Sequence, residues 1–163
     1  MQTFEITISK DDIIAEVRNE THKFGKGRDN GSLTPQQVSN LQADDLAQDT
    51  AIVTTACNAA LERAVSALSK HIDGIGGNAE RNTVTITFRM SRYYSPLSNS
   101  AVESGIHEFV KAMTTYEYLK LVAPNDAILY HKVAENKLTE VKSSLNYKKW
   151  RSQSTSNLTS DNA

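Results

Sequence analysis

The chain has 163 residues, of which 39% are hydrophobic and 23% charged, a balance that indicates one folded domain and excludes disorder of the whole chain. The formal net charge of −1 gives the protein no overall electrostatic attraction for nucleic acid or for an anionic membrane. The single cysteine, Cys57, cannot form a disulfide within the chain, so a disulfide framework is excluded and a reducing compartment is expected.

The first 24 residues predict a strand followed by a helix. Apolar residues alternate with polar ones in the strand, at Phe4, Ile6 and Ile8. Ser9 is placed to cap the helix, Asp11 and Asp12 suit the positive end of its dipole, and Gly25 is expected to end it. The apolar face of the helix is expected to consist of Ile13, Ile14, Val17 and Phe24.

Residues 25–44 predict a mobile loop followed by a short helix. The first nine of them, GKGRDNGSL, are rich in turn-forming residues and have no apolar period. In and beside this loop lie three cations, Lys23, Lys26 and Arg28. They either contact DNA phosphates or a neighbouring chain, or are simply solvated. Thr34 and Pro35 then have the pattern of a capped helix start.

The strongest periodic pattern begins at residue 44 or 45 and predicts a long helix. Its apolar residues are spaced three, four or seven apart: Leu46, Val53, Cys57, Leu61, Ala64, Leu68 and Ile72. Frequent alanines leave a slim surface that another backbone can approach closely. Because Cys57 lies on the apolar stripe, we expect a buried, unreactive thiol.

A glycine-rich turn and a second strand are predicted after this helix. The turn is assigned to residues 73–78, which contain three glycines but no following Lys-Ser or Lys-Thr pair, as a phosphate-binding loop would have. Residues 83–90 alternate polar and apolar side chains, which is typical of a half-buried strand. The β component is therefore expected to be a short two-stranded element.

Two further helices are predicted in the last part of the domain. The first is expected to begin with a capping box from Ser100 to Glu103 and to end at Ala123-Pro124. The second, capped by Asn125 or Asp126, is expected to run antiparallel beside it. The expected buried faces are Val102, Ile106, Phe109, Val110, Met113, Tyr116 and Leu119, followed by Ile128, Leu129, Val133, Leu138, Val141 and Leu145.

These elements predict one mostly helical domain over residues 1–146, in the order β-α-(α)-α-β-α-α. Three to four main helices form a bundle, and the two strands are a minor component. Residues 147–163 are polar and serine-rich and have no periodic apolar face, which predicts a flexible C-terminal tail.

No residue pattern matches a catalytic, cofactor-binding or metal-binding site. The four histidines are dispersed over four predicted helices without a partner at metal-ligand spacing: His22, His71, His107 and His131. The acidic pairs fall at expected helix starts, and no serine has the context of a nucleophile. We therefore expect a protein that is not an enzyme, uses no cofactor and does not span a membrane.

The segment Tyr147-Lys148-Lys149-Trp150-Arg151 is the predicted partner-binding segment. It places the only tryptophan among three cations just after the last helix. Tryptophan and arginine are the residue types that most often dominate binding energy at interfaces. The alternative is that Trp150 folds back onto the last helix.

This order of elements, with a Tyr-Tyr-Ser-Pro turn at residues 93–96 and a helix pair joined at Pro124, resembles the head-to-tail connector (adaptor) proteins of tailed bacteriophages. The resemblance spans most of residues 1–151, and its most telling part runs from Tyr116 through Leu145 into the basic tail. The stretch 25–45 is longer than in the shortest members.

The resemblance implies a structural virion protein, one subunit of a ring of usually twelve copies that docks on the portal and surrounds the DNA exit channel. The implied partners are other copies of the chain, the portal protein, a downstream neck or tail protein, and DNA contacted only weakly. The implied location is the neck of the virion, assembled in the cytoplasm of the bacterial host. In such rings the terminal extension reaches into the portal or a neighbouring subunit, a role that residues 147–151 would fill.

Two other functions fit the same residues. One is a small cytosolic helical adaptor or regulatory protein that is recruited through its tail. The other is a nucleic-acid-binding module that uses Lys23, Lys26, Arg28 and the tail, and salt-sensitive DNA binding would identify it.

Overall fold

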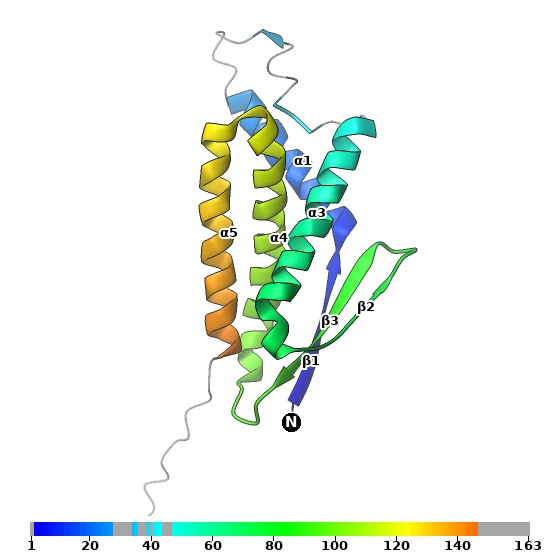
Figure 1. Cartoon of the computed structure of the whole chain (residues 1–163), viewed down its shortest axis with the longest axis vertical. Coiled ribbons are helices and arrows are strands. Elements are labelled where there is room, and N and C mark those ends of the chain that lie inside the picture. The colour runs from blue at the N-terminus through cyan, green and yellow to red at the C-terminus, as the bar shows by residue number, and fades with distance from the viewer. Residues whose placement is uncertain (1, 28–33, 36–38, 40, 44–46, 147–163) are drawn as a thin grey trace, which may run out of the picture.

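The computed structural model describes residues 2–27, 34–35, 39, 41–43 and 47–146. In this part of the chain four main helices pack beside a three-stranded antiparallel sheet (Figure 1), which confirms the mostly helical fold class. The elements are β1 (Gln2–Ser9), α1 (Lys10–Gly27), α3 (Ala47–Leu68), β2 (Ile72–Asn78), β3 (Thr83–Met90), α4 (Asn99–Val122) and α5 (Pro124–Leu145).

The sheet has the strand order β1-β3-β2, so the two predicted strands pair with each other within one chain. Ile6 lies opposite Ile86, and Phe4 lies opposite Phe88. The third strand, β2, is the glycine-rich segment that was predicted to be a turn, and that prediction was wrong. Glycines disfavour strands but do not prevent them, and here the backbone of β2 completes the hydrogen-bond ladder along β3.

The core lies between one face of the sheet and the helices. Figure 1 shows α4 between α3 and α5, with α1 crossing behind. The apolar residues of β1 and β3 point to this core, as their alternation predicts, while the threonines between them remain on the other face. The largest fully buried side chains include Phe88, Phe109, Ile13, Leu68 and Ile106.

Helix α1 begins as the sequence predicts but ends later. The Asp12 N–H group donates to the Ser9 hydroxyl at 3.3 Å, and acidic residues occupy the first turn. Gly25 does not end the helix, which continues to Gly27. Instead, Gly25 permits a close approach, because a Cβ atom there would lie 2.8 Å from the Gln42 side chain.

Residues 41–43 are held against α1 and α4 by hydrogen bonds. The Ala43 N–H group donates to the buried Thr21 hydroxyl at 3.1 Å, and the Tyr118 hydroxyl donates to the Gln42 carbonyl at 2.8 Å. Residues 28–33 of the predicted loop lie outside the described residues, as do residues 36–38 and 40 in the predicted short helix and the predicted start of the long helix at 44–46.

The later helix boundaries also differ from the predicted ones. Helix α3 ends at Leu68, a turn earlier than predicted, and Ile72 belongs to β2. Helix α4 begins at Asn99 behind a short 3-10 turn that starts at Pro96, so the predicted capping box at Ser100 does not form. One residue, Ala123, joins α4 to α5, and Pro124 is already helical. Proline is tolerated there because the first N–H groups of a helix have no acceptor within the helix.

Candidate assembly surface

Five large aliphatic side chains are exposed near the end of the α4–α5 hairpin, on more than one side of it. We name this group the tip cluster: Leu121, Val122, Ile128, Leu129 and Val133. Leu121 borders a groove between α3 and α4, whereas Leu129 and Val133 border a pocket lined from α1, α4 and α5. Leu129 is 65% exposed and Leu121 is 62% exposed. Among the described residues, the other exposed large apolar side chains are Ile75, Tyr93 and Leu97. Clustering of such residues on a soluble domain marks an interaction surface more often than single exposed residues do.

The tip cluster corrects the predicted buried face of α5. Its second half is buried as predicted, at Leu138, Val141 and Leu145, but Ile128, Leu129 and Val133 are exposed. Alanines at positions 127 and 134 take the buried positions instead. The buried stripe 127, 134, 138, 141 and 145 keeps a helical spacing of seven, four, three and four residues. In the first half of α5 this stripe consists of the small residues Ala127 and Ala134, so the apolar pattern of the sequence favoured their larger neighbours.

A groove of about 460 Å³ runs between α3 and α4 and reaches the tip cluster at Leu121. Its floor and α3 side are formed by small residues and one isoleucine: Ala51, Ile52, Thr55, Ala56 and Ala59. Its α4 side carries the ion pair of Glu117 and Lys120. The slim alanine surface predicted for the long helix is therefore open to solvent along part of its length.

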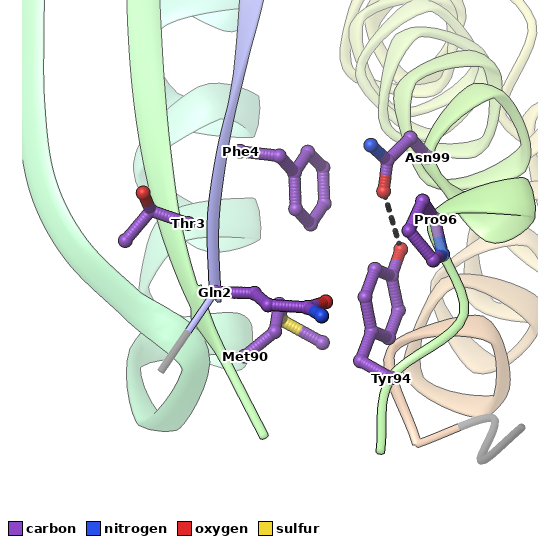
Figure 2. Close-up of a pocket in the computed structure, with 7 residues that line it drawn as sticks. All are labelled: Gln2, Thr3, Phe4, Met90, Tyr94, Pro96 and Asn99. Carbon is purple, nitrogen blue, oxygen red and sulfur yellow. Dashed lines mark hydrogen bonds between the residues drawn. The ribbon is translucent and has the colours of Figure 1, made fainter. Parts of the chain in front are cut away.

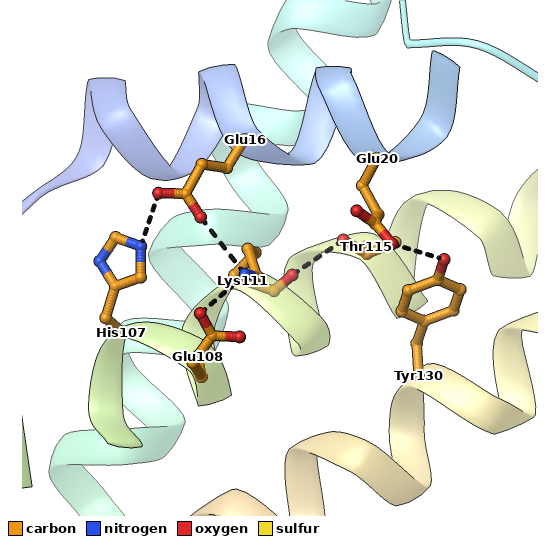
Figure 3. A network of polar contacts seen from close by, with 7 residues as sticks. All are labelled: Glu16, Glu20, His107, Glu108, Lys111, Thr115 and Tyr130. Carbon is orange, nitrogen blue, oxygen red and sulfur yellow. Dashed lines mark hydrogen bonds and ion pairs between the residues drawn. The ribbon is translucent and has the colours of Figure 1, made fainter. Parts of the chain in front are cut away.

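A polar network lies between α1 and α4 (Figure 3). The Glu16 carboxylate accepts from His107 at 3.0 Å and lies 3.3 Å from the Lys111 ammonium, which also contacts Glu108 at 2.8 Å. Burial alone would raise the pKa of Glu16, but the hydrogen bonds and charges of His107 and Lys111 outweigh burial and lower it. Burial would lower the pKa of Lys111, whereas its two carboxylate partners raise it.

The network borders a pocket of about 290 Å³ that is lined from α1, α4 and α5, whereas the groove is lined from α3 and α4. Leu129 and Val133 of the tip cluster form its apolar wall, and Glu20 and Tyr130 contribute to its polar wall. Burial, followed by the nearby Glu20 charge, raises the pKa of Tyr130 to about 12. The Tyr130 hydroxyl therefore keeps its proton and donates to Glu20 at 3.3 Å, which ties α5 to α1 (Figure 3).

A third pocket, of about 280 Å³, lies at the opposite end of the hairpin, and we name it the basal pocket. In Figure 2 the side chains of Gln2, Phe4 and Met90 face those of Tyr94, Pro96 and Asn99, and the Thr3 side chain points away. The rings of Phe88, Phe4 and Tyr94 form a stack with centroid distances of 5.0 and 5.6 Å. The Tyr94 hydroxyl donates to the Asn99 amide oxygen at 2.9 Å.

No group of three or more His, Cys, Asp or Glu side chains in the described part of the chain could hold a metal ion. His107 contacts Glu16, while His131 packs edge-on against Tyr116, so both have structural partners. Cys57 is fully buried, and burial raises the pKa of its thiol, as expected for an unreactive cysteine. None of the helices in the described ranges combines the length and apolar character that crossing a membrane requires.

The structure covers only part of the predicted site. Lys23 and Lys26 are exposed, but they lie in the last turns of α1 rather than in a loop, because α1 continues past Gly25. Arg28 and the segment Tyr147-Lys148-Lys149-Trp150-Arg151 lie outside the described residues. Comparison of the chain with protein-family models, curated proteins and solved structures found no match.

Proposed function

We propose that this chain is a structural subunit that assembles with copies of itself into a ring, and that the ring is a head-to-tail connector of a tailed bacteriophage. The tip cluster carries the assembly part of the proposal. Fully burying an exposed aliphatic side chain contributes about 1.5–3 kcal/mol. The members of the tip cluster are 36–65% exposed, so each would contribute a part of that value when a partner covers it.

A second copy of the chain fits this surface because the molecule presents two different apolar features. The tip cluster consists of large branched side chains, and the groove between α3 and α4 is lined mainly by small ones. A chain cannot place its tip cluster in its own groove, because Leu121 belongs to both and one residue joins α4 to α5. Contacts between unlike surfaces of identical chains repeat head to tail and can close into a ring.

The charge of the chain is compatible with self-association. A formal net charge of −1 produces little repulsion between copies at neutral pH. The groove carries Glu117 and Lys120, which neutralise each other, so an apolar partner surface meets no unbalanced charge there.

The connector part of the proposal rests on the resemblance in element order and in the hairpin segment from Tyr116 to Leu145. In this reading, residues 147–151 contact the portal protein or a neighbouring subunit, and the ring surrounds DNA that it contacts weakly. The protein then belongs to the neck of the virion, and it performs no chemical step.

The experiment that tests this proposal is a mass measurement of the purified full-length chain, alone and mixed with portal rings. We expect concentration-dependent oligomers of the chain alone and a defined complex with the portal. A chain that stays monomeric at high concentration and does not bind portal rings would contradict the proposal. Oligomers without portal binding would instead favour the cytosolic adaptor.

The nucleic-acid-binding alternative receives less support from the described residues. Lys23 and Lys26 lie at the C-terminal end of α1, where positive charge favourably compensates the helix dipole without any DNA. A gel-shift titration at low salt separates the two functions. A nucleic-acid-binding module must bind DNA at low salt, and its affinity must fall steeply as salt is added.

A further inference from the structure

We propose that the basal pocket is a binding site for an aromatic side chain, and that Trp150 of the same chain occupies it in the free subunit. This inference goes beyond the proposed function and does not depend on ring assembly. It rests on the chemistry of the pocket walls, on the place where α5 ends and on the length of chain that follows.

The pocket walls suit a flat ring with one polar edge. Phe4, Tyr94 and Met90 offer two aromatic rings and a thioether, all of which pack favourably against an indole. The Asn99 amide oxygen accepts one hydrogen bond from Tyr94, and its second lone pair can accept the indole N–H group. A volume of about 280 Å³ is at the lower end for small-molecule sites and suits a single large side chain.

The end of α5 lies close to this pocket. Val141 packs directly against Gly105, where an added Cβ atom would lie 2.5 Å from the valine methyl group. In this antiparallel pair Leu145 is therefore level with position 101, about 3 Å along the helix axis from Asn99. With an interaxial distance of about 8–10 Å, the axis of α5 at Leu145 lies roughly 10 Å from the axis of α4 at Asn99, which lines the pocket. Figure 1 shows α5 ending at the same end of the molecule as the start of β1.

The chain after α5 is long enough for this contact and too short for the other pockets. Trp150 is five residues beyond Leu145, and five extended residues span at most about 17 Å. The pocket beside Val133 is about 18 Å away along α5, and the groove at Leu121 is about 30 Å away, by the rise of 1.5 Å per residue. Of the three hollows described above, only the basal pocket is comfortably within reach of Trp150 in its own chain.

Docking of Trp150 would place the cations of the predicted partner-binding segment on the surface beside the pocket. Lys148, Lys149 and Arg151 flank the tryptophan in sequence and would stay in water while the indole is covered. A partner that takes hold of Trp150 must then displace it from Phe4 and Tyr94. The pocket would thus keep the only tryptophan of the chain out of water until a partner competes for it.

Trp150 is the only tryptophan, so its intrinsic fluorescence reports directly on this contact. We expect a blue-shifted emission and a severalfold lower acrylamide quenching constant in the folded full-length chain than in urea, equally in dilute and concentrated solution. Asn99→Phe fills the pocket and Tyr94→Ala removes one wall, so both should return the quenching constant towards its value in urea. The matched control Thr55→Phe fills the groove on α3 and should leave the quenching constant unchanged.

Three results would overturn the proposal. They are an exposed Trp150 in the dilute wild-type chain, protection that persists in Asn99→Phe, and protection that develops only at high concentration, which would indicate contact between copies. A second measurement does not disturb the fold: Trp150→Ala should shift the methyl signal of Met90 by removing a ring current, and leave that of the core residue Met113 in place. An unchanged Met90 signal would contradict docking in the basal pocket.

Discussion

The two halves of the α4–α5 hairpin use similar apolar side chains in opposite ways. Near the base, Leu138, Val141 and Leu145 are buried, and Gly105 lets the two helices approach closely. Near the tip, α5 turns alanines towards α4 and leaves Ile128, Leu129 and Val133 in solvent. The second half of α5 therefore stabilises the fold, whereas its first half exposes apolar side chains to solvent.

This difference shows that an apolar residue in a helix has two possible partners, its own core or another molecule. At the base the backbones are close and the large side chains interlock, so the free energy of unfolding depends on them. At the tip the same residue types contribute little to the free energy of unfolding of the monomer, and they would be buried only when the chain associates with a partner. Matched substitutions in the two halves should therefore have different effects on the free energy of unfolding.

The largest expected effect is the contrast between Leu138→Ala and Leu129→Ala. Leu138 is 8% exposed, so its truncation should lower the free energy of unfolding by about 2–5 kcal/mol through lost burial and a cavity. Leu129→Ala should change the free energy of unfolding of the monomer by less than about 0.5 kcal/mol. Urea denaturation at low protein concentration measures both values, and equal losses would refute the division of the hairpin into two halves.

A smaller effect is expected from Gly105→Ala, which tests the close approach at the base. The new Cβ atom would lie 2.5 Å from the Val141 methyl group, so the helices must separate slightly, at a cost of about 1–3 kcal/mol. The gain in helix propensity, about 1 kcal/mol, offsets part of that loss. Gly76→Ala is the control, because its Cβ atom would meet nothing within 4 Å. Stabilisation by Gly105→Ala would show that the base is less tightly packed than described.

The smallest effect concerns Glu16, which ties α1 to the middle of α4 between the two halves. Its pKa in the folded chain is lowered below the ordinary value of 4.5, so it stabilises the fold above that pH and loses this contribution as the pH falls through the folded pKa. Glu16→Gln should therefore lower the free energy of unfolding at neutral pH, and the difference in this free energy between variant and wild type should shrink towards acidic pH. Because the side chain is 43% exposed, we expect less than about 1 kcal/mol. Denaturation curves at several pH values measure the trend, and a difference that grows on acidification would have the wrong sign.

The regular elements with strong apolar periods were predictable from the sequence, and the elements that depend on tertiary contacts were not. The alternation in 83–90 and the stripe from Val53 to Leu68 are local signals, and both were confirmed. Strand β2 has no such signal, because its glycines form a strand only by pairing with β3. Likewise, nothing local indicates that Gly25 lies inside helix α1, where the absence of a side chain leaves room for Gln42.

The candidate site was predicted only in part. The helix pair and the slim alanine surface were expected, but the α5 members of the tip cluster, Ile128, Leu129 and Val133, were predicted to be buried, in positions that Ala127 and Ala134 take. The choice between two adjacent helical stripes depends on how closely α4 and α5 approach, which one sequence does not reveal. The predicted segment 147–151 lies outside the described residues and remains a prediction.

The most direct test of the account asks whether the tip cluster is covered when copies of the chain assemble. Because Cys57 is buried, a cysteine introduced by Leu129→Cys would be the reactive thiol of the folded chain, and Asn136→Cys provides an exposed control on the same helix. The rate of thiol modification should fall at position 129 as protein concentration rises, while position 136 stays reactive. Equal reactivity of the two positions at every concentration would contradict an interface between copies at the tip.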